Sequence, residues 1–222
     1  MPKTNVITVP EIKLERHTLH IVGMSPLIVH AFPEKQRKAM LDKQMKQAKG
    51  GRDARDPEAE FQAARYILPD GTDGFPAVAF KAAAVTACTS IADVTKIAAR
   101  QAFRVEGQAM NQEGILEGST VRTALVPLIA HPPTMREDVV RLSGPSRAAE
   151  MRYRPEYWPW GVELSVIINP QVVGFGQLVS MFQAAGHGVG VGDYRPDRSG
   201  DCGTFEVVSD KEFAKWRKEA KL

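Results

Sequence analysis

The stretch that decides the fold lies near the C-terminus and reads Gly186-His187-Gly188-Val189-Gly190-Val191-Gly192-Asp193-Tyr194-Arg195-Pro196-Asp197-Arg198-Ser199-Gly200-Asp201-Cys202-Gly203, followed by Thr204-Phe205-Glu206-Val207-Val208. Six of the eighteen residues from Gly186 to Gly203 are glycine, and glycine leaves neighbouring backbone N–H groups uncrowded by Cβ atoms. The loop also carries a tyrosine and two arginines, so it could lie against a phosphate chain. Its candidate nucleic-acid contacts are Gly190, Gly192, Tyr194, Arg195 and Arg198. The alternative is an ordinary flexible hairpin whose glycines only satisfy positive-φ positions.

Two segments have the spacing of helices that pack on a sheet. In residues 77–92, one stripe holds Phe80, Ala84, Ala87 and Ile91, and an adjacent stripe holds Val78, Ala82, Val85 and Thr89. In residues 175–185, just before the glycine run, one face holds Phe175, Leu178, Phe182 and Ala185. Apolar residues at this spacing predict amphipathic helices.

Strand patterns occupy much of the remaining chain. Alternating or β-branched runs lie at residues 17–22, 27–30, 102–107, 121–129, 138–142, 161–168 and 204–208, each bounded by turn residues. Without its insertions, the order of elements is the α+β plan βαββαβ, the ferredoxin-like or RRM-like core. We expect one domain over residues 1–222, with an appended C-terminal helix over about 210–222.

Residues 33–65 interrupt this plan with a strongly charged segment. Its first part is rich in Lys, Gln, Met and Ala, Gly50-Gly51 ends that part, and residues 52–60 are nearly all charged. We interpret it as a mobile basic excursion from the core; the alternative is a solvated surface helix without a partner. Its basic residues are Lys35, Arg37, Lys38, Lys43, Lys46, Lys49 and Arg52.

The charge and composition permit a polyanionic partner without requiring one. The chain has 222 residues, a formal net charge of +3 and 43% hydrophobic residues, enough for one sizeable core. Cys88 and Cys202 match no metal-ligand spacing, so we expect reduced thiols, no metal and no cofactor. No apolar run reaches the roughly twenty residues of a membrane helix, and we expect a cytoplasmic protein with no membrane partner.

Further candidate contacts lie outside the glycine loop. Lys81 is the only charge in residues 77–92 and could meet an anion near the helix N-terminus, or simply snorkel to the surface. Asp93 can cap a short helix that carries Lys96 and Arg100. Residues 135–160 interleave arginines with aromatic residues, as phosphate neutralisation and base stacking require; the alternative is a set of Arg–Glu pairs on strand faces. The arginines proposed as contacts in this segment are Arg147, Arg152 and Arg154.

Catalytic patterns are weak. His17 and His20 fall on opposite faces of a strand, and no familiar nucleophile, phosphate-loop or metalloprotease motif occurs. The one arrangement that could imitate a nucleophile and base is His187 with Asp193 and Cys202. We therefore assign no catalytic residues and expect a protein that is not an enzyme.

Two short motifs resemble a known superfamily. The run Phe75-Pro76-Ala77-Val78-Ala79-Phe80-Lys81-Ala82-Ala83 resembles the opening of the first helix in the RAMP superfamily, the RRM-like backbone subunits of CRISPR effector complexes. The segment from Gly190-Val191-Gly192 to Gly200-Asp201-Cys202-Gly203-Thr204-Phe205 is similar to the glycine-rich loop of that superfamily. The resemblance implies binding of single-stranded nucleic acid, with subunits stacked along the strand, a thumb touching the neighbouring subunit, and Lys81 and Tyr194 beside the strand.

The chain also resembles an uncharacterised protein family of tailed phages and prophages. The resemblance is carried by Ser25-Pro26-Leu27-Ile28-Val29-His30, Met135-Arg136-Glu137-Asp138 and Arg152-Tyr153-Arg154-Pro155-Glu156-Tyr157. It implies a phage-encoded protein in a bacterial host cell and carries over no function.

Three functions follow as hypotheses. The first is a non-catalytic protein that binds single-stranded DNA or RNA and forms a homo-oligomer, possibly helical, along the strand. The second is an RNA-processing endonuclease on the same fold, and the third is a phage accessory protein that acts through protein contacts only. Salt-dependent oligonucleotide binding separates the first two from the third.

Overall fold

The structure, a computed structural model, describes residues 12–32, 38, 40–42, 44–45, 54–90, 94–108, 124–141 and 149–222. It contains both helices and antiparallel sheets, which confirms the predicted α+β class. No helix in the described part of the chain is long and apolar enough to cross a membrane.

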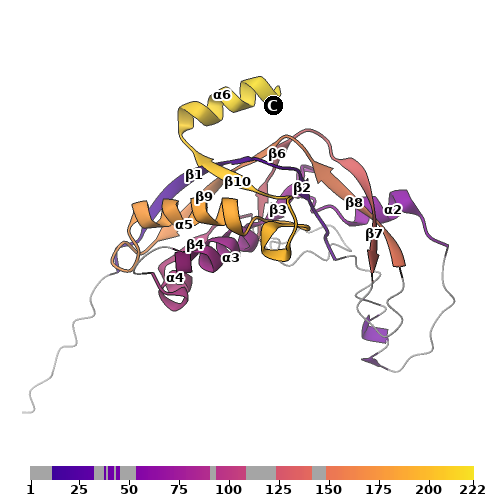
Figure 1. The fold of residues 1–222 in the computed structure, drawn as a ribbon, viewed down its shortest axis with the longest axis horizontal. Coiled ribbons are helices and arrows are strands. Elements are labelled where there is room, and N and C mark those ends of the chain that lie inside the picture. Colours follow the sequence, from indigo (N-terminus) through magenta and orange to yellow (C-terminus); the bar gives the residue numbers. More distant parts are fainter. Residues whose placement is uncertain are drawn as a thin grey trace, which may run out of the picture.

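The central sheet has the strand order β10-β1-β9-β4 (Figure 1). Its strands are β1 (Glu15–Gly23), β4 (Phe103–Val105), β9 (Trp160–Ile168) and β10 (Phe205–Val208). Every neighbouring pair is antiparallel, and short β6 (Ile129–Ala130) also pairs with β9. β1 and β9 are the two central strands of this order. Residues of both that face the helices, such as Leu19 and Leu164, are almost fully buried.

Helices α3 (Ala77–Ala87) and α5 (Phe175–Gly188) lie together under one face of this sheet (Figure 1). The stripe of Phe80, Ala84 and Ala87 is buried as predicted, while Ile91 lies outside the described residues. The adjacent stripe is not one face, because Val85 is buried whereas Val78 is 58% exposed.

The outer edge of β10 is closed by a side chain of α5. The Gln183 amide donates to the Val207 carbonyl at 2.8 Å and accepts from the Val207 N–H at 3.2 Å. Gln183 thus takes the place of one residue of a neighbouring strand, so this part of the edge offers no free backbone groups.

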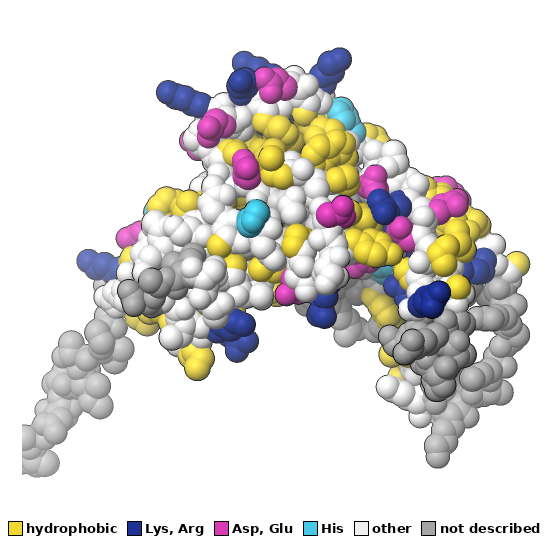
Figure 2. Space-filling view, in the orientation of Figure 1, with side chains coloured by type: hydrophobic (Ala, Val, Ile, Leu, Met, Phe, Trp, Pro, Cys, Tyr) yellow, Lys and Arg dark blue, Asp and Glu magenta, His cyan; other side chains and the backbone are white. Residues whose placement is uncertain are grey.

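The predicted C-terminal helix is present as α6 (Asp210–Ala220), on the face of the sheet opposite α3 and α5 (Figure 1). It begins with a capping box between Ser209 and Glu212. Its Phe213 is buried and stacks on His20, with the two ring centroids 4.6 Å apart. Trp216 lies over Gly161, where a Cβ atom would overlap its ring. Figure 2 shows hydrophobic side chains gathered below this helix.

A second sheet extends from the central one as a long hairpin. β2 (Leu27–Ile28), β8 (Ala149–Tyr157) and β7 (Thr134–Arg141) have the order β2-β8-β7, and β3 (Gly74–Pro76) pairs with β5 (Leu125–Pro127). β7 begins earlier than the predicted strand at 138–142, and β8 was not predicted as a strand. In β7 the consecutive charges Arg136, Glu137 and Asp138 interrupt the alternation on which the prediction depends. In β8 charged residues do alternate with Met151, Tyr153 and Tyr157, and this pattern was missed.

Part of the predicted excursion is an ordered helix, α2 (Pro57–Ala63), packed on β8. Asp56 caps it by accepting from the N–H groups of Glu58 and Ala59, and Phe61 is buried. The predicted excursion over residues 33–65 therefore includes a helix that packs on β8. The expected cap of α4 (Lys96–Ala102) also differs, because Thr95 accepts from the Ala98 N–H, while Asp93 lies outside the described residues.

Candidate functional site

The glycine loop, residues 189–204, is a tightly packed unit. Gly190, Gly192 and Gly203 have positive φ, and a Cβ atom on Gly203 would overlap the Val191 carbonyl oxygen. Many of its N–H groups bond within the protein; the Val191 N–H, for example, donates to Gly203 O at 2.9 Å. The glycines thus serve the packing of the loop, and few of its amides stay free for a phosphate.

Tyr194 is held by this packing in an unusual conformation. Its φ is +54°, a left-handed value that is uncommon for a bulky residue, and its carbonyl accepts from the Cys202 N–H at 2.9 Å. The ring lies over two guanidinium groups, 4.8 Å from Arg154 Cζ and 5.9 Å from Arg136 Cζ, and the residue is 38% exposed. One aromatic ring is therefore fixed at the seam between the glycine loop and the β7–β8 hairpin.

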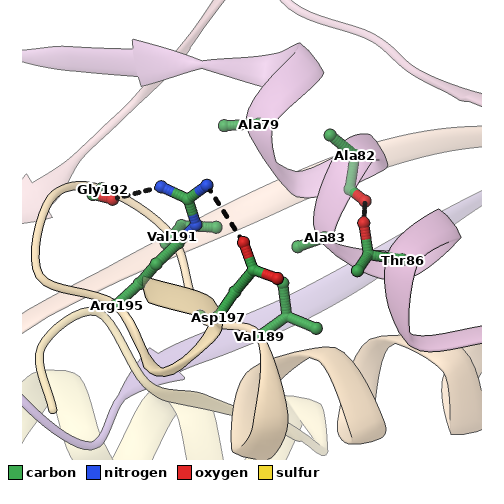
Figure 3. Close-up of a pocket in the computed structure, with 10 residues that line it drawn as sticks. Ala79, Ala82, Ala83, Thr86, Val189, Val191, Gly192, Arg195 and Asp197 are labelled. Atoms are coloured by element: carbon green, nitrogen blue, oxygen red, sulfur yellow. Dashed lines mark hydrogen bonds and ion pairs between the residues drawn. The ribbon is translucent and has the colours of Figure 1, made fainter. Parts of the chain in front are cut away.

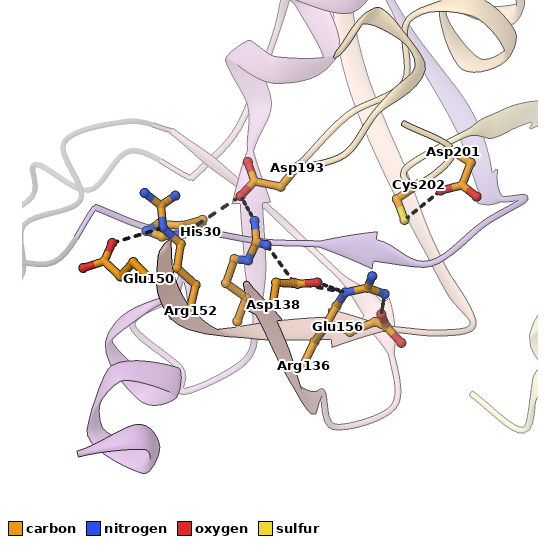
Figure 4. A network of polar contacts seen from close by, with 10 residues as sticks. His30, Arg136, Asp138, Glu150, Arg152, Glu156, Asp193, Asp201 and Cys202 are labelled. Carbon is orange, nitrogen blue, oxygen red and sulfur yellow. Dashed lines mark hydrogen bonds and ion pairs between the residues drawn. The ribbon is translucent and has the colours of Figure 1, made fainter. Parts of the chain in front are cut away.

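A charged network that includes both guanidinium groups joins the hairpin to the loop (Figure 4). Arg154 is 3% exposed and donates from Nη1 to Asp193 at 2.6 Å and from Nη2 to Asp138 at 2.7 Å. Arg136 donates to Asp138 at 3.0 Å and to Glu156 at 2.7 Å. The network matches the Arg–acid pairing that the sequence left as an alternative for this segment.

Arg152 and His30 lie at the other end of the network (Figure 4). Arg152 forms an ion pair with Glu150 at 3.8 Å, and its side chain is 37% exposed. His30 lies 3.9 Å from Asp193, yet desolvation by burial lowers its pKa. The imidazole is therefore neutral at neutral pH.

The two arginines of the loop differ in exposure. Arg195 donates to Gly192 O at 3.1 Å and lies 3.4 Å from Asp197. Arg198 is in the 3₁₀ turn η2 (Pro196–Arg198), and its side chain is 73% exposed, 3.6 Å from Asp197. Of the two, Arg198 is the better placed to reach a phosphate.

A shallow pocket separates the glycine loop from α3 (Figure 3). Small side chains of α3, among them Ala79, Ala82 and Thr86, form one wall, and Val189 and Arg195 belong to the other.

Lys81 lies on the other side of α3 from this pocket. Its ammonium group donates to Arg100 O at 2.9 Å and lies 5.6 Å from the ring centroid of Phe103, and burial lowers its pKa. Residues 79, 82, 83 and 86 lie on the side of α3 that faces the glycine loop. Position 81 is two residues, or about 200°, from position 79 around the helix. It therefore points away from the loop. Lys81 contacts α4 at Arg100, on the side of α3 away from the loop that carries Tyr194.

The arrangement of His187, Asp193 and Cys202 that could imitate a nucleophile and base does not assemble. His187 is exposed at the end of α5, and in the described part of the chain no hydrogen bond or ion pair joins it to Asp193 or Cys202. Burial raises the pKa of the Cys202 thiol, which keeps it protonated at neutral pH. The described residues also contain no group of three or more His, Cys, Asp or Glu side chains that could hold a metal ion.

Several predicted contacts lie outside the described residues. These are Arg147 in the hairpin loop and Lys35, Arg37, Lys43, Lys46, Lys49 and Arg52 in the excursion. Lys38 is described and exposed.

Arg136 was not among the contacts predicted from the sequence. Acidic residues are visible beside the arginines of residues 135–160, but the sequence alone does not show which acid pairs with which arginine. Alternation along β7 and β8 was the available signal, because residues two apart share a face, and Arg136 lies directly opposite Arg154 in the register.

Comparison with known proteins gives little further information. No family model matches the chain, and no curated protein matches it. Among solved structures, the crystal structure of Cmr6 from Pyrococcus furiosus is similar at a TM-score of 0.39 and 12% identity, covering 89% of this chain and 100% of that chain. A similarity this low assigns neither the fold nor the function.

Proposed function

We propose that this chain is a non-catalytic protein that binds single-stranded nucleic acid. Its core is proposed to be a ferredoxin-like βαββαβ unit of the RAMP type within a single domain of residues 1–222. The strand order β10-β1-β9-β4, with α3 and α5 on one face, supports this plan, since that order follows when two βαβ halves interleave in one antiparallel sheet.

The observation that carries the proposal is the position of Tyr194. Its ring is backed by the Arg154 guanidinium at 4.8 Å and remains 38% exposed. A ring fixed in this way can stack on a base, and stacking of a base on an aromatic ring contributes about 1–3 kcal/mol.

The charges around this ring suit a phosphate chain. Arg136, Arg195 and Arg198 have side chains that are 38%, 30% and 73% exposed. All three keep an acidic neighbour, so they would add short-range phosphate contacts rather than a large positive field.

The uncovered face of the central sheet is a weaker candidate. By alternation and register, the described side chains on this face beyond α6 include Arg16, Thr18, Arg104, Glu163 and Ser165, and none of these is aromatic. RRM domains stack bases on sheet aromatics. We therefore assign base stacking to Tyr194.

The test is salt-dependent binding of single-stranded DNA and RNA oligonucleotides, measured by fluorescence anisotropy. Binding should weaken linearly on a log–log plot as salt rises. Tyr194→Ala should weaken binding, whereas Tyr194→Phe, which keeps the ring, should not. Absence of binding to both nucleic acids, or equal affinities for a folded Tyr194→Ala variant and the parent, would refute the proposal.

The proposal includes assembly of successive subunits along the strand, in the cytoplasm of a bacterial host. Mass photometry with and without each oligonucleotide tests it, because it measures binding and subunit number together. Cleavage of a bound RNA would instead favour the endonuclease.

A further inference from the structure

Strand β1 is only partly covered along its outer edge. β10 pairs with β1 from His20 to Gly23, whereas β9 pairs along the other edge from Glu15 to Val22. In the part of the chain that the structure describes, no strand pairs with the outer edge of residues 15–19. Figure 1 shows β1 running past the end of β10.

The backbone groups along this edge are ready for an additional strand. The Met24 N–H donates to Thr204 O on the β10 side at 2.8 Å. Because the direction of these groups alternates along a strand, the N–H and C=O groups of Arg16 and Thr18 point to the same side. Both residues are exposed, and an unpaired edge of this kind is a template for pairing with another chain.

A groove lies beside the unpaired edge. Its apolar lining is Leu19 of β1, Phe175 and Val179 of α5, and Val207 and Val208 of β10, and its polar lining is Thr18, His20, Ser209 and Asp210. Phe175 is 38% exposed. Strand addition draws affinity from backbone hydrogen bonds and specificity from pockets for alternate side chains, and this site offers both.

The N-terminal sequence contains a segment that fits this site. Val6-Ile7-Thr8-Val9 lies outside the described residues, and three of its four side chains are apolar and all four are β-branched, which favours a strand. By alternation, Ile7 and Val9 would face the groove while Thr8 lies on the polar side with Thr18.

We propose that residues 6–9 of a second copy of this chain add to β1 as an edge strand. Within one chain, pairing of Thr8 with Thr18 would require the backbone to reverse in residues 10–14, and Ile12, Lys13 and Leu14 are not in a turn. A segment from a second copy needs no such reversal. The proposal rests on the assembly part of the proposed function and names the contact that would join successive subunits.

Two single-cysteine variants test the contact. Thr8→Cys protein and Thr18→Cys protein, carrying tags of different size, are mixed under mild oxidation; native Cys88 and Cys202 are both buried. A disulfide that joins one copy of each variant is expected. Thr8→Cys mixed with Lys211→Cys, an exposed position on α6, is the matched control. Cross-linking no greater than in the control would overturn the proposal. So would a disulfide that forms only within one chain of a variant carrying both Thr8→Cys and Thr18→Cys.

A second measurement uses the assembly itself. Thr8→Pro removes one N–H from the segment and should abolish masses above that of one chain in mass photometry, while Thr8→Val should keep them. Unchanged masses for Thr8→Pro would also overturn the proposal. The two proposals can fail separately. If Thr8→Pro assembles as the parent does while oligonucleotide binding still depends on Tyr194, only the proposed edge-strand contact is refuted. If the cross-link forms but the protein binds no oligonucleotide, only the proposed function is refuted.

Discussion

The ring of Tyr194 lies over the guanidinium of Arg154, 4.8 Å from its centroid to Cζ. Arg154 is almost fully buried, so the ring covers its charge on the solvent side. Tyr194→Ala should reduce oligonucleotide affinity about tenfold, within the range of about 1–3 kcal/mol for the stacking of one base. The salt slope should stay unchanged, because stacking releases no counterions. Anisotropy titrations at several salt concentrations measure both quantities, and a shallower slope would show that the variant neutralises fewer phosphates than the parent.

Replacement of the arginines of the loop should instead change the salt dependence of oligonucleotide binding. Replacing Arg195 and Arg198 with glutamine should make the salt slope shallower by about 0.7 for each phosphate that the protein no longer neutralises. Arg198 should account for more of the change, because its side chain is 73% exposed. The single variants separate the two residues, and a parental slope for the double variant would place the phosphate-binding residues elsewhere.

Removal of Arg154 should destabilise the protein strongly. Arg154→Met removes the 2.7 Å contact to Asp138, which still pairs with Arg136, and the 2.6 Å contact to Asp193. The loss of these two contacts at a buried guanidinium should lower the free energy of unfolding by about 2–3 kcal/mol. Arg152→Met, at an exposed pair, should cost less than about 1 kcal/mol. Urea unfolding measures both variants. Equal losses would show that burial of Arg154 adds nothing to the strength of its pairing.

Gly203 tests whether the loop needs its glycines for packing. Gly203→Ala places a Cβ atom on the Val191 carbonyl oxygen at a φ of +68°, and should cost about 2 kcal/mol. Gly176→Ala, near the start of α5 with nothing within 4 Å, should instead stabilise the protein by about 0.5 kcal/mol. Thermal unfolding compares the two, and a neutral Gly203→Ala would mean that the loop relaxes easily.

Acid should destabilise the protein in part through His30. Burial lowers its pKa from the ordinary value of 6.5, so the unfolded chain binds more protons than the folded protein as the pH falls below about 6.5. Stability is then lost from about pH 6.5 downwards, until the folded-state pKa is passed. Urea midpoints at pH 7.5, 6.5 and 5.5 should fall less for His30→Gln than for the parent, and parallel curves would contradict the assignment.

Periodicity was sufficient to predict the elements of the central sheet. β1, α3, α5 and β10 each carry a face of apolar residues with a regular period, and each was predicted near its observed position. α6 was also expected near its position, although it buries only Phe213. The β7–β8 hairpin was only partly recognised, because consecutive charges interrupt the alternation in β7 and the alternation in β8 was read as a run of Arg–acid pairs. Its burial depends on partners distant in the chain, which no local pattern contains.

The candidate site shows the same limit. The sequence placed Tyr194 and the arginines in suitable segments, but Arg154 meets Asp193 across 39 positions, a pairing that only the folded chain reveals. Lys81 was grouped with Tyr194 through the family resemblance, whereas the phase of α3 turns it towards α4 instead.

The amide of Gln183, which bonds both backbone groups of Val207, has a consequence for binding. The two residues flank the glycine loop, one on the helix that enters it and one on the strand that leaves it. Their hydrogen bonds hold together the helix and the strand that flank the loop. The segment that carries Tyr194 is therefore preorganised for the proposed binding of a nucleic-acid strand. Recognition by a fixed loop costs little conformational entropy, and its affinity should therefore depend on the fit of the bound strand rather than on ordering of the protein.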